Sequence, residues 1–307
     1  MKRFFERLYY HPKGVDYFLI AALSPFSLLY GSYMLVRRLA AKKRDFGLPI
    51  VSVGNLVVGG SGKTPFVIAL ASRYENVAIV SRGYGRESKG LLEVSRNGTI
   101  LADVKQSGDE PMLMAQSLPN ASVIVSEKRE DAITLAKENG ASVIILDDGF
   151  NRVDIEKYDL LLKPASIPNT LPFPAGPLRE FSFSECFADK VVQEGRDFRR
   201  IVQVTPFEGK LLLATAIANP VRLEPYLPNT VVGRFYLEDH AYFDEHQLAK
   251  NMEEAGADAL LVTQKDAVKM DRFKLPVVQM KLKLEIEETI LESIDSYIKK
   301  YKELHEE

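Results

Sequence analysis

The sequence predicts an α/β protein with three parts: a parallel-sheet core, a second and smaller α/β domain, and an N-terminal apolar helical segment. Between residues 46 and 205, short β-branched runs alternate with helical stretches, a pattern typical of parallel sheets covered by helices. The same alternation resumes over 206–307. Residues 1–45 differ from both, because they hold a long uncharged stretch between two basic clusters.

Composition restricts the class of protein. The chain has 307 residues, of which 46% are hydrophobic and 27% charged, enough for a core that needs no covalent cross-links. Its one cysteine, Cys186, excludes an intrachain disulfide and a zinc site built from cysteines. The four histidines are widely separated, which argues against a histidine-only metal site. We therefore expect a globular protein from a reducing compartment.

The first 45 residues have the features of a membrane-associated segment. They carry nine lysines and arginines against three acidic residues, a net charge of +6 that leaves −8 on the remainder. Residues 17–36 are uncharged, about the length that a helix needs to cross a bilayer. Basic residues on both sides favour the anionic cytoplasmic leaflet. We favour a helix lying in or dipping into that leaflet; a single span and a buried hairpin kinked at Pro25 are the alternatives.

Hydrophobic runs and helix signals place the elements of the first domain. Strands are expected at 49–53, 76–80, 121–125, 142–146 and 158–162, with helices at 63–74 and 127–139. A loop rich in proline then follows, containing Pro164, Pro168, Pro172, Pro174 and Pro177. It is too long for an ordinary connection, which suggests a functional role.

The second domain repeats the alternation of strands and helices. Strands are expected at 210–216, 230–237, 259–263 and 277–281, and helices at 245–255 and 286–301. The division near residue 205 rests on the resumption of this pattern.

The strongest motif lies between the first strand and the first helix of the core. A hydrophobic strand leads into a glycine-rich loop that ends in Gly-Lys-Thr, and a helix begins at once. Backbone amides of such a loop close around a triphosphate, the lysine reaches its β- and γ-phosphates, and the threonine hydroxyl binds Mg²⁺. The predicted nucleotide-binding residues are Val57, Val58, Gly59, Gly60, Ser61, Gly62, Lys63 and Thr64. Val57 occupies the position of the usual first glycine.

Two aspartates end another hydrophobic strand. Asp147 and Asp148 follow four apolar residues, and a P-loop protein needs a carboxylate near its metal in this setting. An Asp-Gly turn is the structural alternative, but behind a P-loop motif a metal site is the better interpretation. The sequence therefore predicts Mg²⁺ held by Thr64 and by Asp147, Asp148 or both.

Three further sites have both a structural and a functional interpretation. Asp109 stands where a loop enters a helical stretch, so a helix cap is the simpler explanation for it. Arg82 and Arg86 follow a strand and either contact phosphate or flank a glycine turn. His240 ends a strand and is a structural residue or a base. Thr263 is explained as a helix cap, because the following residues lack the spacing of a guanine-reading motif.

Taken in order, the motifs resemble the tetraacyldisaccharide 4′-kinase family, the lipid A 4′-kinases. The resemblance extends over most of the chain and includes the basic-flanked apolar N-terminus and the unusual P-loop. It rests on the P-loop from Val53 to Pro65, on Ser81-Arg-Gly-Tyr-Gly85, Gly108-Asp-Glu-Pro111, Asp147-Asp-Gly-Phe150, Pro174-Ala-Gly-Pro-Leu-Arg-Glu180, Asp239-His240 and Thr263-Gln-Lys-Asp-Ala267.

The resemblance implies a P-loop kinase that moves the ATP γ-phosphate to the 4′-hydroxyl of an acylated glucosamine disaccharide 1-phosphate, giving lipid IVA. Asp109 would be the catalytic base, paired with His240 from the second domain, and Lys63 would act on the phosphates. Arg82 and Arg179 are candidates for contacts to anionic substrate groups. ATP and Mg²⁺ are the expected cofactors.

The lipid substrate also implies partners and a location. We expect contact with inner-membrane lipids at the cytoplasmic face of the bacterial inner membrane, no nucleic-acid partner, and a monomer. The rival interpretation is a membrane-associated nucleotide-switch ATPase or GTPase. Against it, Val58 stands near the place of the upstream lysine of dimerising ATPases, and the Asn-Lys-x-Asp element of GTPases is absent.

Overall fold

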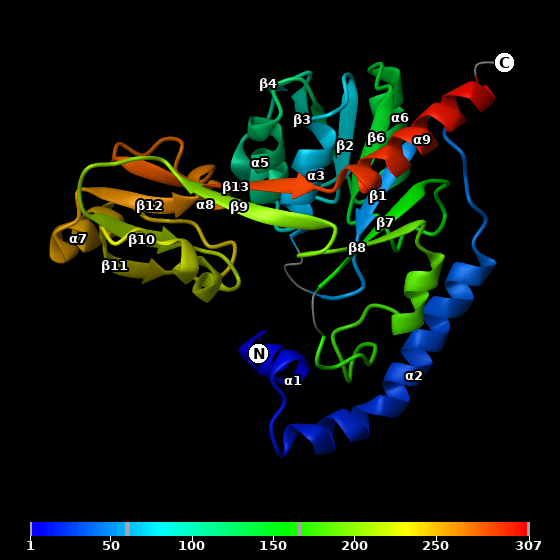
Figure 1. Cartoon of the computed structure of the whole chain (residues 1–307), viewed down its shortest axis with the longest axis horizontal. Coiled ribbons are helices and arrows are strands. Elements are labelled where there is room, and N and C mark those ends of the chain that lie inside the picture. Colours follow the sequence, from blue (N-terminus) through cyan, green and yellow to red (C-terminus); the bar gives the residue numbers. More distant parts are fainter. Residues whose placement is uncertain (1, 59–61, 165–166, 306–307) are drawn as a thin grey trace.

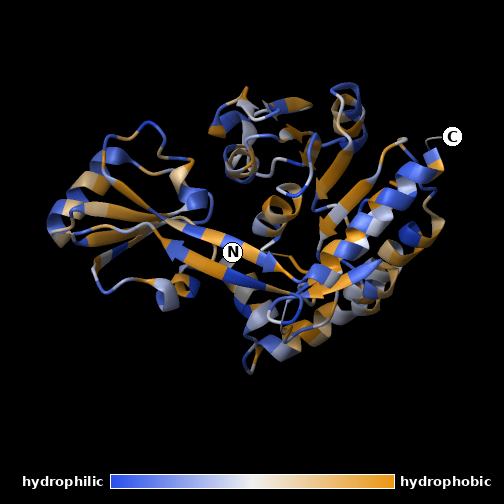
Figure 2. Ribbon diagram, turned by 45° about the horizontal axis from the view of Figure 1, so that its top comes forward, coloured by the Kyte–Doolittle hydropathy of each residue, from blue (hydrophilic) through white to orange (hydrophobic). Residues whose placement is uncertain are grey.

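The computed structural model describes residues 2–58, 62–164 and 167–305. Over these residues it has a sheet of eight strands and a sheet of five. Figure 1 shows the small sheet extending to the left of the large one, while helix α2 (Asp16–Ala40) runs along the lower right. Most strands of the two sheets are hydrophobic along their length, whereas the long pair of strands between the sheets and the helices mix hydrophobic and hydrophilic positions (Figure 2).

The large sheet has the strand order β4-β3-β5-β2-β6-β1-β7-β8. From β5 to β8 neighbouring strands are parallel, whereas β3 and β4 are antiparallel at one edge. The strands are β1 (Ile50–Gly54), β2 (Val77–Ser81), β3 (Leu92–Arg96), β4 (Thr99–Ile100), β5 (Ser122–Val125), β6 (Val143–Asp147), β7 (Tyr158–Lys163) and β8 (Lys190–Gln193). The five strands expected from the sequence are confirmed to within one residue, and β3, β4 and β8 were not anticipated.

Helices cover both faces of the large sheet. Helices α3 (Lys63–Ala71), α5 (Asp109–Ser117) and α9 (Glu288–His305) bury apolar residues in one core, which includes Phe66, Met114 and Ile294. Helix α6 (Arg129–Glu138) packs in a second core through Ile133. Two short helical segments, α4 (Val104–Ser107) and η1 (Ser182–Phe187), lie in the connections.

The small sheet has the order β11-β10-β12-β13-β9. Its members are β9 (Phe198–Val204), β10 (Leu211–Thr215), β11 (Val231–Tyr236), β12 (Ala259–Thr263) and β13 (Val277–Ile286). Its helical segments are η2 (Pro220–Tyr226), α7 (Glu245–Ala255) and α8 (Gln264–Ala267). The predicted helix at 245–255 is confirmed, whereas β9 was not expected and β13 extends five residues beyond its prediction.

The two sheets are connected by a pair of antiparallel strands. β9 leads from the large sheet into the small one, β13 returns beside it, and α9 follows directly. Because α9 buries Ile290 and Ile294 in the core of the large sheet, the C-terminal helix packs with the first unit. The expected boundaries 1–45, 46–205 and 206–307 stay a prediction, and sheet membership suggests 198–286 for the second unit.

The N-terminal segment forms α1 (Lys2–Tyr10) and the continuous helix α2, so the alternative of a buried hairpin kinked at Pro25 is wrong. α2 is long and apolar enough to cross a membrane, and only 17% of its most hydrophobic window is buried. One face packs on the proline-rich loop, where the amide of Ala175 donates to Ser27 Oγ (2.8 Å) and the ring of Tyr30 contacts Phe173. The other face exposes Phe18, Phe26, Leu29, Tyr33, Val36 and Leu39.

Candidate active site

The phosphate-binding motif connects β1 to α3 at the centre of the large sheet. Gly62 precedes the helix with φ +77°, a conformation that favours glycine. Lys63 opens α3, and its Nζ donates to Asn55 Oδ1 (3.1 Å) and lies 3.4 Å from Asp148 Oδ1. Thr64 follows in the first turn, half-buried. The N-terminus of α3 therefore offers a cation and helix amides to an anion.

Of the other predicted nucleotide-binding residues, the structure describes only Val57 and Val58. Gly59, Gly60 and Ser61 lie outside the described residues. Val57 is buried and Val58 donates its amide to Pro177 O (2.9 Å), so these two residues attach the start of the loop to the proline-rich segment. The Val58 amide is therefore bonded to this segment.

Asp147 and Asp148 end β6, beside the P-loop strand. Val53 of β1 pairs with Asp147, so the parallel register brings both motifs to one sheet edge. Asp147 is buried and accepts a hydrogen bond from Ser81 Oγ (2.8 Å). Asp148 has φ +56° and accepts two hydrogen bonds from Arg179 Nη1, both 2.8 Å. Arg179, predicted as a substrate contact, is therefore paired with Asp148 in the structure.

The two aspartates have opposite electrostatic environments. Burial, with the negative charges of Glu110 and Asp148, raises the pKa of Asp147 to about 6. Burial would also raise the pKa of Asp148, but the charges of Lys63 and Arg179 hold it below its ordinary value. The negative charge of ionised Asp147 is therefore not fully balanced by its neighbours, as expected for a carboxylate that binds a cation.

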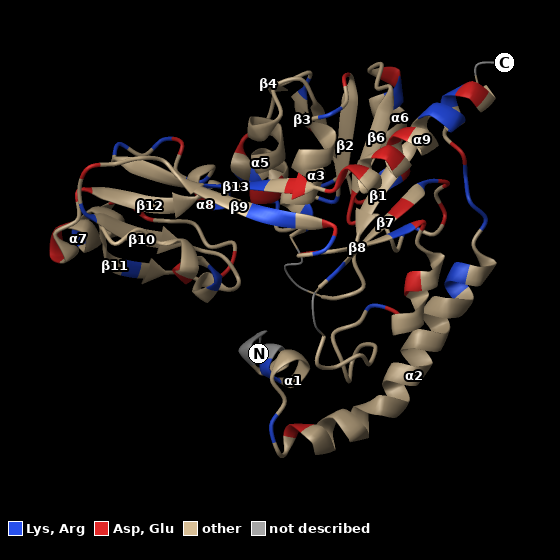
Figure 3. Ribbon diagram, in the orientation of Figure 1, with Lys and Arg blue, Asp and Glu red and all other residues tan. Residues whose placement is uncertain are grey.

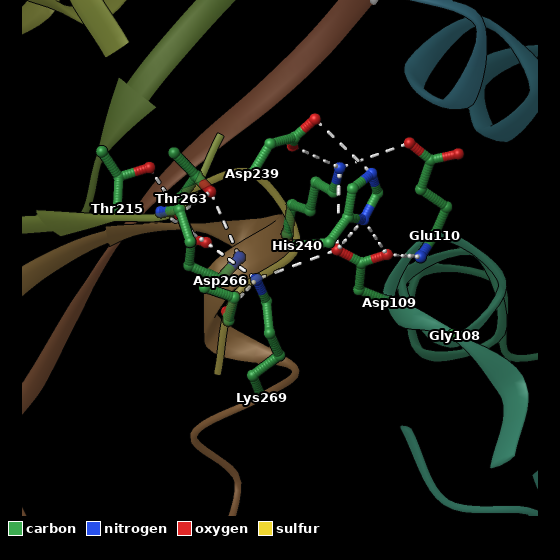
Figure 4. A network of polar contacts seen from close by, with 12 residues as sticks. Gly108, Asp109, Glu110, Thr215, Asp239, His240, Thr263, Asp266 and Lys269 are labelled. Atoms are coloured by element: carbon green, nitrogen blue, oxygen red, sulfur yellow. Dashed lines mark hydrogen bonds and ion pairs between the residues drawn. The ribbon is translucent and has the colours of Figure 1, made fainter. Parts of the chain in front are cut away.

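The Asp109 and His240 side chains meet between the two units. His240 Nδ1 lies 3.0 Å from both carboxylate oxygens of Asp109, although 131 positions separate the two in sequence (Figure 4). Asp109 is the first residue of α5, with Gly108 in the cap position, and is 5% exposed. The predicted helix-cap role is therefore not the arrangement found, and Asp109 directs its carboxylate to the second unit.

Lysines complete the surroundings of Asp109. Lys265 Nζ lies 3.6 Å from Asp109 Oδ2, 3.3 Å from Glu110 Oε1 and 3.6 Å from Asp239 Oδ1. Lys269 Nζ lies 3.8 Å from Asp109 Oδ2. Burial would raise the pKa of Asp109, but the His240 hydrogen bond and the charge of Lys265 keep that pKa below its ordinary value. Asp109 is thus held ionised.

A buried aspartate contacts this cluster through Lys269, whose Nζ lies 3.4 Å from Asp266 Oδ1. Asp266, fully buried in α8, accepts hydrogen bonds from Thr215 Oγ1 (2.7 Å), Thr263 Oγ1 (2.7 Å) and the amide of Ala216 (3.1 Å). The predicted cap role of Thr263 is confirmed, because its side chain accepts from the amide of Asp266. His240 has φ +66° and donates its amide to Ala216 O (3.1 Å). The backbone carrying His240 is therefore fixed to the small sheet.

Sequence reasoning missed Lys265 and Lys269. Lys265 lies in α8 and Lys269 in the turn that follows it. Their spacing of four residues, which on a helix brings two side chains to one face, is the signal that could have indicated a shared partner. Of the two arginines after β2, Arg86 donates to Gly90 O (2.5 Å) and Glu127 Oε1 (2.7 Å), which supports its structural role. Arg82 is exposed.

The two clusters are linked electrostatically. The negative charge of Glu110, the neighbour of Asp109, helps to raise the pKa of Asp147. No group of three or more His, Cys, Asp or Glu side chains in the described part of the chain could hold a metal by itself. Mg²⁺ commonly uses one or two carboxylates together with substrate phosphates. A P-loop, paired aspartates and an Asp–His pair define a nucleotide-dependent phosphotransferase.

Comparisons with known proteins identify the family. A family model described as Tetraacyldisaccharide-1-P 4′-kinase matches residues 19–299. The chain belongs to this family and is an ATP-dependent kinase of lipid A biosynthesis. The kinase interpretation is therefore confirmed over the nucleotide-switch alternative.

Similar proteins extend along nearly the full length. A tetraacyldisaccharide 4′-kinase from Helicobacter pylori (strain HPAG1) is 48% identical, covering 98% of this chain and 96% of its own. One from Aliarcobacter butzleri is 42% identical, covering 97% of each. A crystal structure of LpxK from Aquifex aeolicus, described as a complex with ATP, is 30% identical with a TM-score of 0.78, covering 91% of this chain and 99% of that one.

Proposed function

We propose that this kinase transfers the ATP γ-phosphate to the 4′-hydroxyl of a tetraacylated glucosamine disaccharide 1-phosphate, with Asp109 and His240 as the proton-accepting pair. The hydroxyl oxygen forms a bond to the γ-phosphorus, and the bond from that phosphorus to the bridging oxygen breaks to release ADP. The hydroxyl proton passes to the Asp109–His240 pair. The observation that carries this proposal is the 3.0 Å contact between Asp109 and His240.

The environment of Asp109 supports the role of a base. A catalytic base must be ionised before it accepts a proton, and His240 and Lys265 favour the ionised form. His240 stabilises the proton once it has been transferred, because its Nδ1 faces the carboxylate. Most of the rate enhancement comes from positioning and from neutralising phosphate charge.

We assign the nucleotide to the N-terminus of α3. Helix amides, Lys63 and the glycine-rich loop from 57 to 62 would surround the phosphates, as in other P-loop proteins. Lys63 is already held toward the aspartates by Asn55 and Asp148, so binding ATP requires it to exchange carboxylate contact for phosphate contact.

The residues at the edge of the sheet fit Mg²⁺. The available donors are carboxylate and hydroxyl oxygens, which this hard cation prefers, and Asp147 lies buried beside like charge. Thr64, Asp147 and Asp148 would hold the ion. Asp147 is the stronger ligand candidate, because Asp148 is already bound by Arg179 and Lys63. When bound, Mg²⁺ neutralises phosphate charge.

We place the protein at the cytoplasmic face of the inner membrane, with α2 in contact with lipid. Its exposed apolar face and the exposed basic residues Lys42, Lys43 and Arg44 that follow it suit an anionic bilayer surface. Figure 3 shows α2 without charged residues between an acidic N-terminal end and a basic C-terminal end. Arg82 and Arg179 are proposed contacts for anionic groups of the lipid substrate. The Asp109–His240 pair forms within one chain, which supports a monomer.

The test is transfer of label from γ-labelled ATP to the lipid disaccharide in mixed micelles. Asp109→Asn should lose label on lipid by a factor on the order of a thousand while still binding Mg·ATP, since only general-base catalysis is removed. Asp131→Asn, which changes an exposed aspartate on α6, is the matched control. Wild-type turnover by Asp109→Asn would reject the assignment of the base.

A further inference from the structure

An arginine near the C-terminal end of α2 contacts both loops that carry the proposed metal and substrate residues. Arg38 Nε and Nη2 donate to the two carboxylate oxygens of Glu180, each at 2.8 Å. The same Nη2 donates to the carbonyl oxygen of Phe150 (3.0 Å). The side chains of Arg38 and Glu180 are 8% and 2% exposed, so this is a buried, two-point ion pair.

The partners of Arg38 are direct neighbours of the active-site residues. Glu180 follows Arg179, and Phe150 lies two residues after Asp148. Arg179 and Asp148 are joined by two hydrogen bonds of 2.8 Å. Arg38 therefore closes a ring of contacts in which each loop is fixed at two places, once to the other loop and once to α2.

Packing strengthens the same junction. The guanidinium of Arg38 lies 4.3 Å from the centre of the Phe150 ring, which is 2% exposed. Phe150 in turn packs with Leu56, Val57 and Leu178 in a small core that holds the residues leading into the nucleotide loop. A side chain at Gly54 would collide with Phe150 Cβ, so β1 approaches this residue closely. Arg38 thus covers a core that also contains Val57, the first residue of the predicted nucleotide loop.

The turn of α2 that carries Arg38 also faces outward. Val36 and Leu39 are 63% and 66% exposed, on the side proposed to contact lipid. One helical turn therefore joins the membrane-facing surface to the loops of Asp148 and Arg179.

We propose that Arg38 and Glu180 form a clamp through which α2 positions Asp148 and Arg179 for phosphoryl transfer. Arg38 is a positioning residue and contacts neither nucleotide nor lipid. The clamp fixes the loops of residues 147–151 and 176–181 relative to the helix that lies at the membrane. This inference rests on the proposed roles of Asp148 and Arg179.

The first experiment measures loop order in the nucleotide-free protein, independently of activity. In hydrogen exchange, Arg38→Met should raise the exchange rates of amides in 148–152 and 178–181. These include Asp148, which donates to Val53 O, and Arg179, which donates to Leu56 O. The matched control is Lys42→Met, which removes a positive charge from the same basic cluster at an exposed position. Equal exchange in Arg38→Met and Lys42→Met would overturn the proposal.

The second experiment measures kinetics in mixed micelles. Arg38→Met should lower kcat by about tenfold to a hundredfold and raise the Mg²⁺ concentration for half-maximal rate, because small misplacements of reacting groups cost this much. Arg38→Lys keeps the positive charge but cannot form the two-point ion pair, so its kcat and Mg²⁺ requirement should lie between those of wild type and Arg38→Met. If Arg38→Met weakens liposome binding through its lost charge, Lys42→Met should weaken it as well, but Lys42→Met should keep the Mg²⁺ dependence of wild type. The same Mg²⁺ dependence in Arg38→Met and wild type would overturn the clamp.

A double variant covers the case in which Arg38→Met does not fold. Arg38→Met with Glu180→Met removes both buried charges, a replacement that proteins commonly tolerate. This double variant should show raised amide exchange in the two loops and a raised Mg²⁺ requirement. Wild-type amide exchange together with a wild-type Mg²⁺ requirement would overturn the proposal. Failure of the proposed function can be distinguished from failure of the clamp. If the proposed function were wrong, wild-type protein would transfer no label to the lipid, whatever the hydrogen-exchange result.

Discussion

The buried carboxylate of Asp147 makes the nucleotide-free enzyme less stable than it would be with a neutral residue there. Its pKa is about 6, against an ordinary value of 3.8, because burial and the charges of Glu110 and Asp148 oppose ionisation. Each pKa unit corresponds to 1.36 kcal/mol, so ionised Asp147 costs the folded state about 3 kcal/mol. The folded protein holds this proton to a higher pH than the unfolded chain. The free energy of unfolding therefore falls between about pH 4 and pH 6 and stays lower above it.

Asp147→Asn removes the ionisation and keeps an oxygen that can accept from Ser81. In urea unfolding with EDTA at pH 8, the variant should be more stable than wild type by up to about 3 kcal/mol, and the gain should vanish near pH 4. Asp148→Asn is the control of opposite sign, because Lys63 and Arg179 favour the ionised form of Asp148. With Mg·ATP the order should reverse, since only wild type gains a full metal site. A variant less stable than wild type at pH 8 in EDTA would refute the reasoning.

Three further predictions address the phosphate site, the base and the membrane surface. Lys63→Met should lower kcat on the order of a hundredfold by removing a preorganised charge, as measured by transfer of label to lipid. Lys265→Met should raise the pKa of Asp109, because Lys265 lowers it, and so shift the acidic limb of the kcat/KM profile to higher pH; an unmoved limb would exclude this coupling. Phe18→Ser with Leu29→Ser should weaken liposome binding about a thousandfold, since each buried apolar side chain contributes about 2 kcal/mol and the two together about 4 kcal/mol. Unchanged flotation with vesicles would argue against contact through this face.

The interior of the fold could be predicted because buried parallel strands consist of continuous apolar residues. β1, β2 and β6 are buried throughout, and their sequences admit few other interpretations. Strands β3 and β9 were missed because each mixes polar and apolar residues: both are only partly buried. The pattern of β9 is weakened by Arg199 and Arg200, so periodicity alone did not separate it from a loop.

The candidate site was predictable only in part. Lys63 and the two aspartates follow from strand-loop-helix chemistry and from the register of neighbouring strands. The meeting of Asp109 with His240 depends on how the two units pack, which no local spacing encodes, so the expectation came from family resemblance. Arg38 carried no signal at all, because a basic residue at the end of an apolar helix is equally explained by lipid headgroups.

The paired strands β9 and β13 make the small sheet an insertion into the first unit rather than an appendage at its end. Val204 lies opposite Met280 in the ladder, so the chain departs and returns at neighbouring points. A short turn joining these positions would bypass 205–279 and leave the P-loop, the large sheet and α9 in one shorter polypeptide. Such a shortened protein would keep the nucleotide-binding residues but lack His240. Comparing it with the full chain would show what the inserted unit contributes to phosphoryl transfer.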